Sequence, residues 1–148
     1  MLYLVFGEQE LMINKLVDKL AKETLNEVDD FNFVIFDACK TPLYEIVNDA
    51  LTLPFMADKK MIVIRNSYFL TNENPKLEFE QSFNELEEYI DNQNEGVTMV
   101  FTVVTSKLDD KKPLVKKIKE KSKAFALDNV SKKDLPRVVK QMFDKKEV

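Results

Sequence analysis

The chain has 148 residues, of which 45% are apolar and 32% are charged, and its formal net charge is −4. This length fits one ordinary domain with a sizeable core, and a content of only 2 glycines and 5 prolines excludes a low-complexity or disordered protein. With no histidine and a single cysteine, Cys39, the chain cannot form an internal disulfide or a Ser-His or Cys-His nucleophile pair. We therefore expect no metal site, no cofactor and no intrinsic catalysis.

The charges are distributed unevenly along the chain. Residues 1–96 hold 8 basic and 19 acidic side chains, whereas residues 97–148 hold 14 basic and 7 acidic ones. Such asymmetry can mark a face for nucleic acid or for an acidic partner, and solvated helix surfaces explain it more simply. The first residues, MLYLVFGEQE, contain neither a basic leader nor a membrane span. We expect a cytoplasmic protein with no membrane partner.

Five short apolar runs predict β-strands, and the amphipathic stretches between them predict helices. The runs are residues 2–6, 32–36, 61–64, 98–104 and 123–127. Nearly continuous hydrophobicity over a short run is typical of parallel strands that are buried on both faces. The alternation with helices therefore predicts an α/β domain, with a five-stranded, mainly parallel sheet in a three-layer αβα arrangement.

Sequence patterns typical of helices lie between these predicted strands. The first helix is indicated by Leu11, Leu16 and Leu20, and the second by Thr41 as N-cap with Pro42 at the first helical position. A third helix is expected over residues 76–92, after the Asn-Pro pair at 74–75. It would bury five apolar side chains and expose a run of carboxylates. The five are Leu77, Phe79, Phe83, Leu86 and Ile90.

Two more helices are predicted in the basic part of the chain. Leu114, Val115 and Ile118 mark the fourth. The last is expected over residues 131–146, where Ser131 followed three residues later by Asp134 resembles a capping box.

A strand, a glycine and a helix follow one another in YLVFGEQELMINKL, which is where a phosphate-binding P-loop would lie. If Gly7 is the first glycine of that motif, the second glycine falls on Met12, the lysine on Ile13 and the Ser/Thr on Asn14. None of these side chains can cradle or neutralise a phosphate. Asp37 follows the second apolar run, but an aspartate at a strand end usually caps a turn. We expect degenerate nucleotide motifs and no ATP hydrolysis.

An apolar turn precedes the third predicted strand in LTLPFMADKKMIVIRN. We define the elbow segment as Leu53, Pro54, Phe55 and Met56. The charged residues Asp58, Lys59 and Lys60 follow it. An apolar plug on a rigid turn suits the binding of a partner protein, with the charged residues contributing at the rim. Apolar residues at a helix-to-strand junction are normally buried, so packing of Phe55 and Met56 in the core is the alternative interpretation.

Three blocks of the sequence resemble the N-terminal domain of the delta subunit family of bacterial DNA polymerase III. They are YLVFGEQELMI, FNFVIFDACKTPLYEIVNDALTLPFMADKKMIVIRNSYFLT, and VFTVVTSKLDDKKPLVKKI with the later DLPRVVKQMF. The resemblance spans essentially the whole chain and implies one P-loop-like (AAA+-like) domain over residues 1–148 with degenerate nucleotide motifs. It also implies that lid and collar domains, absent from this chain, follow in the full-length protein.

The resemblance further implies a function. Members of this family belong to the clamp loader of a DNA-directed DNA polymerase, a nucleotidyltransferase complex. They bind the sliding clamp (beta subunit) and help to open the ring for loading on primed DNA, without hydrolysing ATP themselves. In the family, two adjacent large apolar residues before the third strand enter a pocket on the clamp. These positions fall on Phe55 and Met56, with Leu53 and Pro54 shaping the turn, and the methionine departs from the commoner second aromatic. The implied partners are the clamp, the other clamp-loader subunits and, through the complex, DNA.

A lysine-rich stretch supports an alternative function. Seven lysines lie between residues 111 and 123, and a non-specific nucleic-acid-binding module could use them to contact phosphates. The seven are Lys111, Lys112, Lys116, Lys117, Lys119, Lys121 and Lys123. No aromatic residue lies among them to stack on a base, and a solvated helix face is the simpler interpretation.

Overall fold

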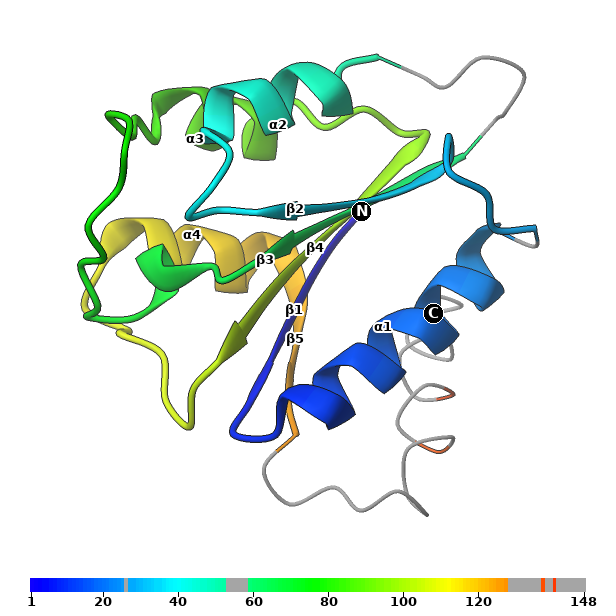
Figure 1. Cartoon of the computed structure of the whole chain (residues 1–148), viewed down its shortest axis with the longest axis horizontal. Coiled ribbons are helices and arrows are strands. Elements are labelled where there is room, and N and C mark those ends of the chain that lie inside the picture. The colour runs from blue at the N-terminus through cyan, green and yellow to red at the C-terminus, as the bar shows by residue number, and fades with distance from the viewer. Residues whose placement is uncertain (26, 53–58, 128–136, 138–139, 141–148) are drawn as a thin grey trace.

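The computed structural model describes residues 1–25, 27–52 and 59–127, together with Arg137 and Lys140 (Figure 1). Strands and helices alternate along the described chain, in the order β1 (Leu2–Gly7), α1 (Glu10–Leu25), β2 (Phe33–Asp37), α2 (Leu43–Ala50), β3 (Lys60–Arg65), the 3-10 helix η1 (Tyr68–Leu70), α3 (Asn84–Asp91), β4 (Val97–Val104), α4 (Pro113–Lys121) and β5 (Ser122–Ala126). All five predicted strands are confirmed, and each boundary lies within one residue of its predicted position.

The strands form one sheet in the order β2-β3-β4-β1-β5, and every neighbouring pair is parallel. Helix α1 covers one face, and α2, α3 and α4 cover the other (Figure 1). The predicted three-layer αβα fold is therefore confirmed. Since all strands run the same way, their amino ends share one edge of the sheet and their carboxyl ends share the opposite edge. We name these the amino edge and the carboxyl edge.

The core consists of two apolar layers, one on each face of the sheet. On the α1 face, Leu16 and Leu20 pack among strand residues that include Tyr3 and Val63. Burial raises the pKa of the Tyr3 phenol to about 12. On the other face, strand residues such as Phe101 pack under the three remaining helices. A sheet that is buried on both faces accounts for the nearly continuous apolar runs in the sequence.

The third helix is shorter than predicted. Residues 76–83 are not helical, and α3 begins only at Asn84. From residue 75 to 84, half-buried positions alternate with exposed ones, so Leu77, Phe79 and Phe83 turn toward the core with a period of two. This is the spacing of extended chain rather than helix. The predicted start at residue 76 was wrong because Leu77 and Phe83, in extended chain, were assigned to the same apolar helix face as Ile90.

The predicted N-cap of the second helix is also wrong. Helix α2 begins at Leu43, Pro42 is its N-cap residue in an extended conformation, and no cap side chain bonds to the helix. The amide of Leu43 instead donates to Oε1 of Gln81, at 2.8 Å. Because the extended segment 76–83 runs past this helix end, a residue far away in sequence satisfies the free amide.

The helix predicted around Leu114, Val115 and Ile118 is confirmed as α4, and these three side chains are buried. The helix predicted over residues 131–146 lies almost wholly outside the described residues. Its two described members, Arg137 and Lys140, are helical and exposed.

Candidate functional site

The elbow segment, residues 53–56, lies outside the described residues, as do Ala57 and Asp58. The structure describes the two chain segments that flank it. We call them the helix stem, Leu51 and Thr52 after α2, and the strand stem, Lys59 and Lys60 at the start of β3. Both stems lie at the amino edge of the sheet, because β3 begins there.

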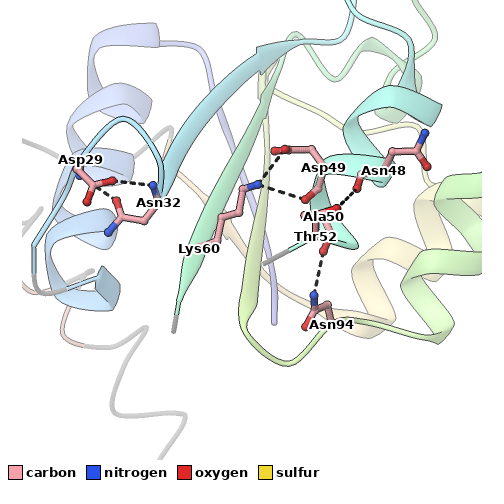
Figure 2. Close-up of polar contacts among 8 residues, drawn as sticks. All are labelled: Asp29, Asn32, Asn48, Asp49, Ala50, Thr52, Lys60 and Asn94. Carbon is pink, nitrogen blue, oxygen red and sulfur yellow. Dashed lines mark hydrogen bonds and ion pairs between the residues drawn. The ribbon is translucent and has the colours of Figure 1, made fainter. Parts of the chain in front are cut away.

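The helix stem is held by polar groups that satisfy the last carbonyls of α2. The hydroxyl of Thr52 donates to the Asn48 carbonyl at 3.3 Å, and Nδ2 of Asn94 donates to the Ala50 carbonyl at 3.2 Å (Figure 2). Helix ends normally leave such carbonyls without partners. The Leu51 side chain stays 57% exposed, so this stem leaves α2 at the molecular surface.

The strand stem is held by a buried lysine. Lys60 is only 5% exposed, and its Nζ lies 2.9 Å from Oδ1 of Asp49 and 3.2 Å from the Asp49 carbonyl oxygen (Figure 2). Its backbone amide donates to the Gly96 carbonyl at 2.9 Å. A buried ammonium requires such partners, because an unpaired charge in the interior is strongly destabilising. Lys60 therefore fixes the start of β3 against the end of α2.

This burial corrects the sequence interpretation of the charged turn. Lys60 was expected to contribute at the rim of a binding surface, but its buried ammonium faces α2. Lys59, the preceding residue, is exposed, and Asp58 lies outside the described residues. Of the three predicted rim residues, only Lys59 is thus shown at the surface.

A polar turn before β2 supports the same edge of the sheet. The backbone amide of Asn32 donates to Oδ1 of Asp29 at 2.8 Å, and its side-chain oxygen accepts from the Asp29 amide at 2.9 Å (Figure 2). The Asn32 carbonyl then accepts from the amide of Met61 at 2.7 Å. This turn therefore connects the chain before β2 to the first residues of β3.

At the carboxyl edge, the structure places nonpolar side chains where a P-loop requires phosphate-binding groups. Met12 and Ile13 point into the core and are 3% and 2% exposed. Nearby, Oε1 of Glu10 pairs with Arg65 at 2.5 Å, so a carboxylate stands at the start of α1. A phosphate bound at that helix terminus would be repelled by this carboxylate.

Asp37, at the end of β2, caps a turn as predicted. Its Oδ1 accepts from the amide of Cys39 at 2.8 Å, and its Oδ2 accepts from the side-chain amide of Asn66 at 2.8 Å. Burial, followed by the negative charges of Asp37 and Glu73, raises the pKa of the Cys39 thiol. Among the described residues, no group of three acidic, cysteine or histidine side chains could hold a metal ion.

The lysine-rich stretch is partly neutralised within the molecule. Lys117 lies 2.6 Å from Asp91, and Lys119 lies 2.8 Å from Asp110. The ammonium of Lys112 donates to the Thr71 carbonyl. The two ion pairs offset part of the positive charge that a polyanion would meet, and the contact with Thr71 occupies the Lys112 ammonium. The predicted acidic face of the third helix is exposed apart from the half-buried Glu87.

A cavity of about 420 Å³ opens between η1 and the start of α4. Its lining is mainly apolar and includes Phe69, Phe83 and Leu114. Glu73 and Glu87 are among its polar lining residues. It lies on the helical face away from α1, and Lys112 is the one residue of its lining that also belongs to the lysine-rich stretch.

Sequence reasoning missed the residues that hold the two stems. Lys60 directly precedes a continuous apolar run, which is a weak signal that its side chain is buried. Nothing local to Asn94 indicates that it caps α2, because Asn94 and its partner Ala50 are 44 residues apart in sequence.

Within the described residues, no helix has the length and hydrophobicity to cross a membrane.

Comparisons with known proteins agree on one family. The family described as DNA polymerase III, delta subunit matches residues 3–127. The DNA polymerase III subunit delta of Bacillus subtilis is 31% identical over 119 residues, which cover 80% of this chain and 34% of that protein. The chain thus spans about a third of the length of this curated relative.

Solved structures show the same fold. The Bacillus subtilis DNA clamp loader delta protein superposes with a TM-score of 0.77 and 29% identity, over 90% of this chain and 40% of that one. A DNA polymerase III gamma subunit-related protein from Thermotoga maritima superposes with a TM-score of 0.64 and 14% identity, over 90% of this chain and 42% of that one. The second likeness concerns the fold alone, and both agree with the AAA+-like architecture. Since the family match extends over residues 3–127, the chain belongs to the DNA polymerase III delta subunit family.

Proposed function

We propose that this chain is the clamp-binding domain of a clamp-loader subunit, and that it binds the sliding clamp (beta subunit) through Leu53, Pro54, Phe55 and Met56. The observation that carries the proposal is the family match over residues 3–127, which includes this segment. The proposal also includes contacts with other clamp-loader subunits, contact with DNA through the assembled complex, and a cytoplasmic location. The lid and collar domains expected beyond residue 148 stay a prediction.

The amino edge suits this role. The helix stem leaves α2 with an exposed Leu51, and the strand stem enters a buried strand through Lys60. Burial of a phenylalanine or methionine side chain contributes about 1.5 to 3 kcal/mol each, so two would contribute roughly 3 to 6 kcal/mol before the costs of association. This is sufficient for an anchor, and lesser contacts around it would add area and orientation.

Ring opening by this subunit needs no chemistry of its own. A protein that binds the open form of a ring more tightly than the closed form shifts the ring toward opening, by the difference between the two binding free energies. The buried Met12 and Ile13 and the Glu10–Arg65 pair support a role without ATP hydrolysis. In the assembled polymerase holoenzyme, this chain would contribute binding, and other subunits would contribute catalysis.

The test is binding of the chain to the sliding clamp by surface plasmon resonance, with the Phe55→Ala/Met56→Ala double variant beside it. A matched control is Leu11→Ala/Val104→Ala, because these side chains are 59% and 47% exposed and lie toward the carboxyl edge. We expect the first double variant to lose binding with an unchanged circular dichroism spectrum, and the control to bind normally. Equal binding by all three proteins would contradict the proposal.

A non-specific nucleic-acid module predicts a different result. It would bind DNA with an affinity that falls steeply with salt, and reversing the charges of Lys111 and Lys116 would weaken that binding. The engagement of Lys117, Lys119 and Lys112 in contacts within the molecule favours the clamp-binding function.

A further inference from the structure

The cavity between η1 and the start of α4 is built by three parts of the chain. Its apolar lining comes from Tyr68 and Phe69 in η1, from Phe83 before α3 and from Leu114 in α4. Phe69 and Leu114 are 3% and 9% exposed, so this lining is continuous with the core. The volume of about 420 Å³ lies within the range of roughly 300 to 1,000 Å³ that is usual for ligand pockets.

The aromatic rings of the lining hold one another in place. The ring of Phe69 lies 5.6 Å from the ring of Tyr68 and 5.6 Å from that of Phe83, measured between centroids. It lies 6.1 Å from the ring of Phe101 in β4, in an edge-to-face arrangement. Such ring pairs are favourable beyond the area that they bury. An occupant of the cavity would therefore meet a preformed aromatic surface.

The charged groups of the lining have an excess of negative charge. The two carboxylates belong to Glu73, in the loop after η1, and to Glu87, in the first turn of α3. The backbone amide of Glu73 donates to the Thr71 hydroxyl at 3.1 Å, which holds this loop. Lys112 supplies the cation of the lining, and its ammonium donates to the Thr71 carbonyl. Within the described residues, neither carboxylate forms an ion pair.

The sequence around the cavity is acidic as well. Residues 73–95 hold 8 acidic side chains and one basic one, Lys76. In the part of the chain that the structure describes, only Asp91 among these eight forms an ion pair, with Lys117. The potential at the cavity therefore favours a cation and opposes a phosphate or another anion. The carboxylate run, which served no purpose in the clamp-binding function, thus borders an apolar cavity.

An arginine side chain matches both properties of the cavity. Its methylene stem and planar guanidinium pack well on aromatic rings, and its N–H groups suit carboxylate acceptors. A lysine ammonium is more strongly hydrated, and a purely apolar side chain would leave the carboxylates without a partner. Apolar neighbours of the arginine would cover the rest of the lining.

We propose that this cavity is a docking site for a partner protein, which inserts an arginine flanked by apolar residues. Phe69, Phe83 and Leu114 contact the stem and its neighbours, and the carboxylates of Glu73 and Glu87 accept from the guanidinium. The cavity lies toward the carboxyl edge, because η1 follows β3 and α4 follows β4. The two stems lie at the amino edge, so this proposal does not rest on clamp binding.

The test is a titration of the isotope-labelled chain with the peptide acetyl-Gly-Leu-Arg-Leu-Gly-amide, followed by amide chemical shifts. We expect the shifts to concentrate on the residues that line the cavity. Citrulline in place of arginine keeps the shape and removes the charge, and should raise the dissociation constant about tenfold. The peptide acetyl-Gly-Gly-Arg-Gly-Gly-amide, which lacks the apolar neighbours, should also bind more weakly.

Matched variants of the chain separate the cavity from the acidic surface around it. Glu73→Gln/Glu87→Gln should raise the dissociation constant about tenfold, because it removes both acceptors of the guanidinium. The control Glu85→Gln/Glu88→Gln removes the same charge from exposed positions of α3 outside the lining and should change the constant little. Circular dichroism should show the same fold for both double variants.

Four results would overturn the proposal. The first is an absence of shifts in the cavity lining up to millimolar peptide. The second is equal binding of the arginine and citrulline peptides. The third is an equal loss of affinity in the two double variants, which would indicate attraction to the acidic surface alone. The fourth is a concentration-dependent shift of the same amides without peptide, because a second copy of the chain would then be the occupant.

Discussion

The two edges of the sheet differ in how they use polar residues. At the amino edge, the buried ammonium of Lys60 pairs with Asp49 at the end of α2, and Asn94 in the turn before β4 bonds to the same helix end. At the carboxyl edge, where open parallel sheets usually bind ligands, Glu10 and Arg65 form a largely exposed ion pair. Under the proposed clamp-binding function, a nucleotide-binding architecture is kept as a scaffold, and the residues that bind the partner belong to the opposite edge.

Restoring a P-loop lysine should have the largest effect. Ile13 lies on the buried face of α1 and is 2% exposed, so Ile13→Lys would place an ammonium in the core. We expect a loss of about 3 kcal/mol or more in unfolding free energy. Urea unfolding followed by circular dichroism measures it. Ile13→Met, which roughly conserves volume, should cost less than about 1.5 kcal/mol. Saturable binding of ATP-magnesium to either variant in calorimetry would show that the carboxyl edge is still a nucleotide site.

Removing one of the two proposed clamp-binding side chains should have the next largest effect. We expect Phe55→Ala alone to raise the dissociation constant for the clamp roughly ten- to hundredfold, corresponding to the burial of one aromatic side chain. Surface plasmon resonance measures this change, with Val104→Ala as the control at the other edge. An unchanged constant would support the alternative in which Phe55 packs in the core.

Breaking the ion pair at the carboxyl edge should change little. The side chains of Arg65 and Glu10 are 41% and 57% exposed, and exposed pairs usually contribute less than about 1 kcal/mol. Arg65→Ala should therefore shift thermal unfolding slightly and leave clamp affinity as it is. A tenfold loss of clamp affinity in this variant would show that the carboxyl edge also contributes to clamp binding, against our proposal.

The smallest expected effect is on the pH dependence of Cys39 alkylation at the carboxyl edge. Because burial and then Asp37 and Glu73 raise the pKa of Cys39, the thiol form persists to higher pH and the reactive thiolate is scarce near neutrality. Alkylation by iodoacetamide should therefore rise with pH along a curve centred above the ordinary value of about 8.5. Glu73→Gln should move that curve modestly downward. A curve centred below the ordinary value would indicate the positive potential of an anion-binding site.

The sequence was sufficient to predict features that depend on local periodicity. Each strand is a continuous apolar run, so its bounds were predicted within one residue. Helix α4 carries Leu114, Val115 and Ile118 at helical spacing, so its presence was predicted as well. The residues around Leu77 were wrongly predicted as helix. In the structure, half-buried and exposed side chains alternate there, as in extended chain, and in so short a polar segment this pattern was taken for part of a longer amphipathic helix. The first turn of α2 was misassigned because its amide partner, Gln81, is distant in sequence.

The candidate site was predictable only in part. The degenerate P-loop follows from residue types alone, and buried Met12 and Ile13 agree with it. The burial of Lys60 was signalled only weakly, by its position before an apolar run, because its partners Asp49 and Gly96 come from two other segments that the fold brings together. The clamp-binding role of Phe55 and Met56 stays a prediction that rests on the family.

The most direct measurement is the dissociation constant for the sliding clamp with and without ATP-magnesium, for the unaltered chain and for Phe55→Ala/Met56→Ala. We expect the same constant in both conditions for the unaltered chain and no binding by the variant. Binding that requires ATP-magnesium, or that survives loss of both side chains, would contradict it.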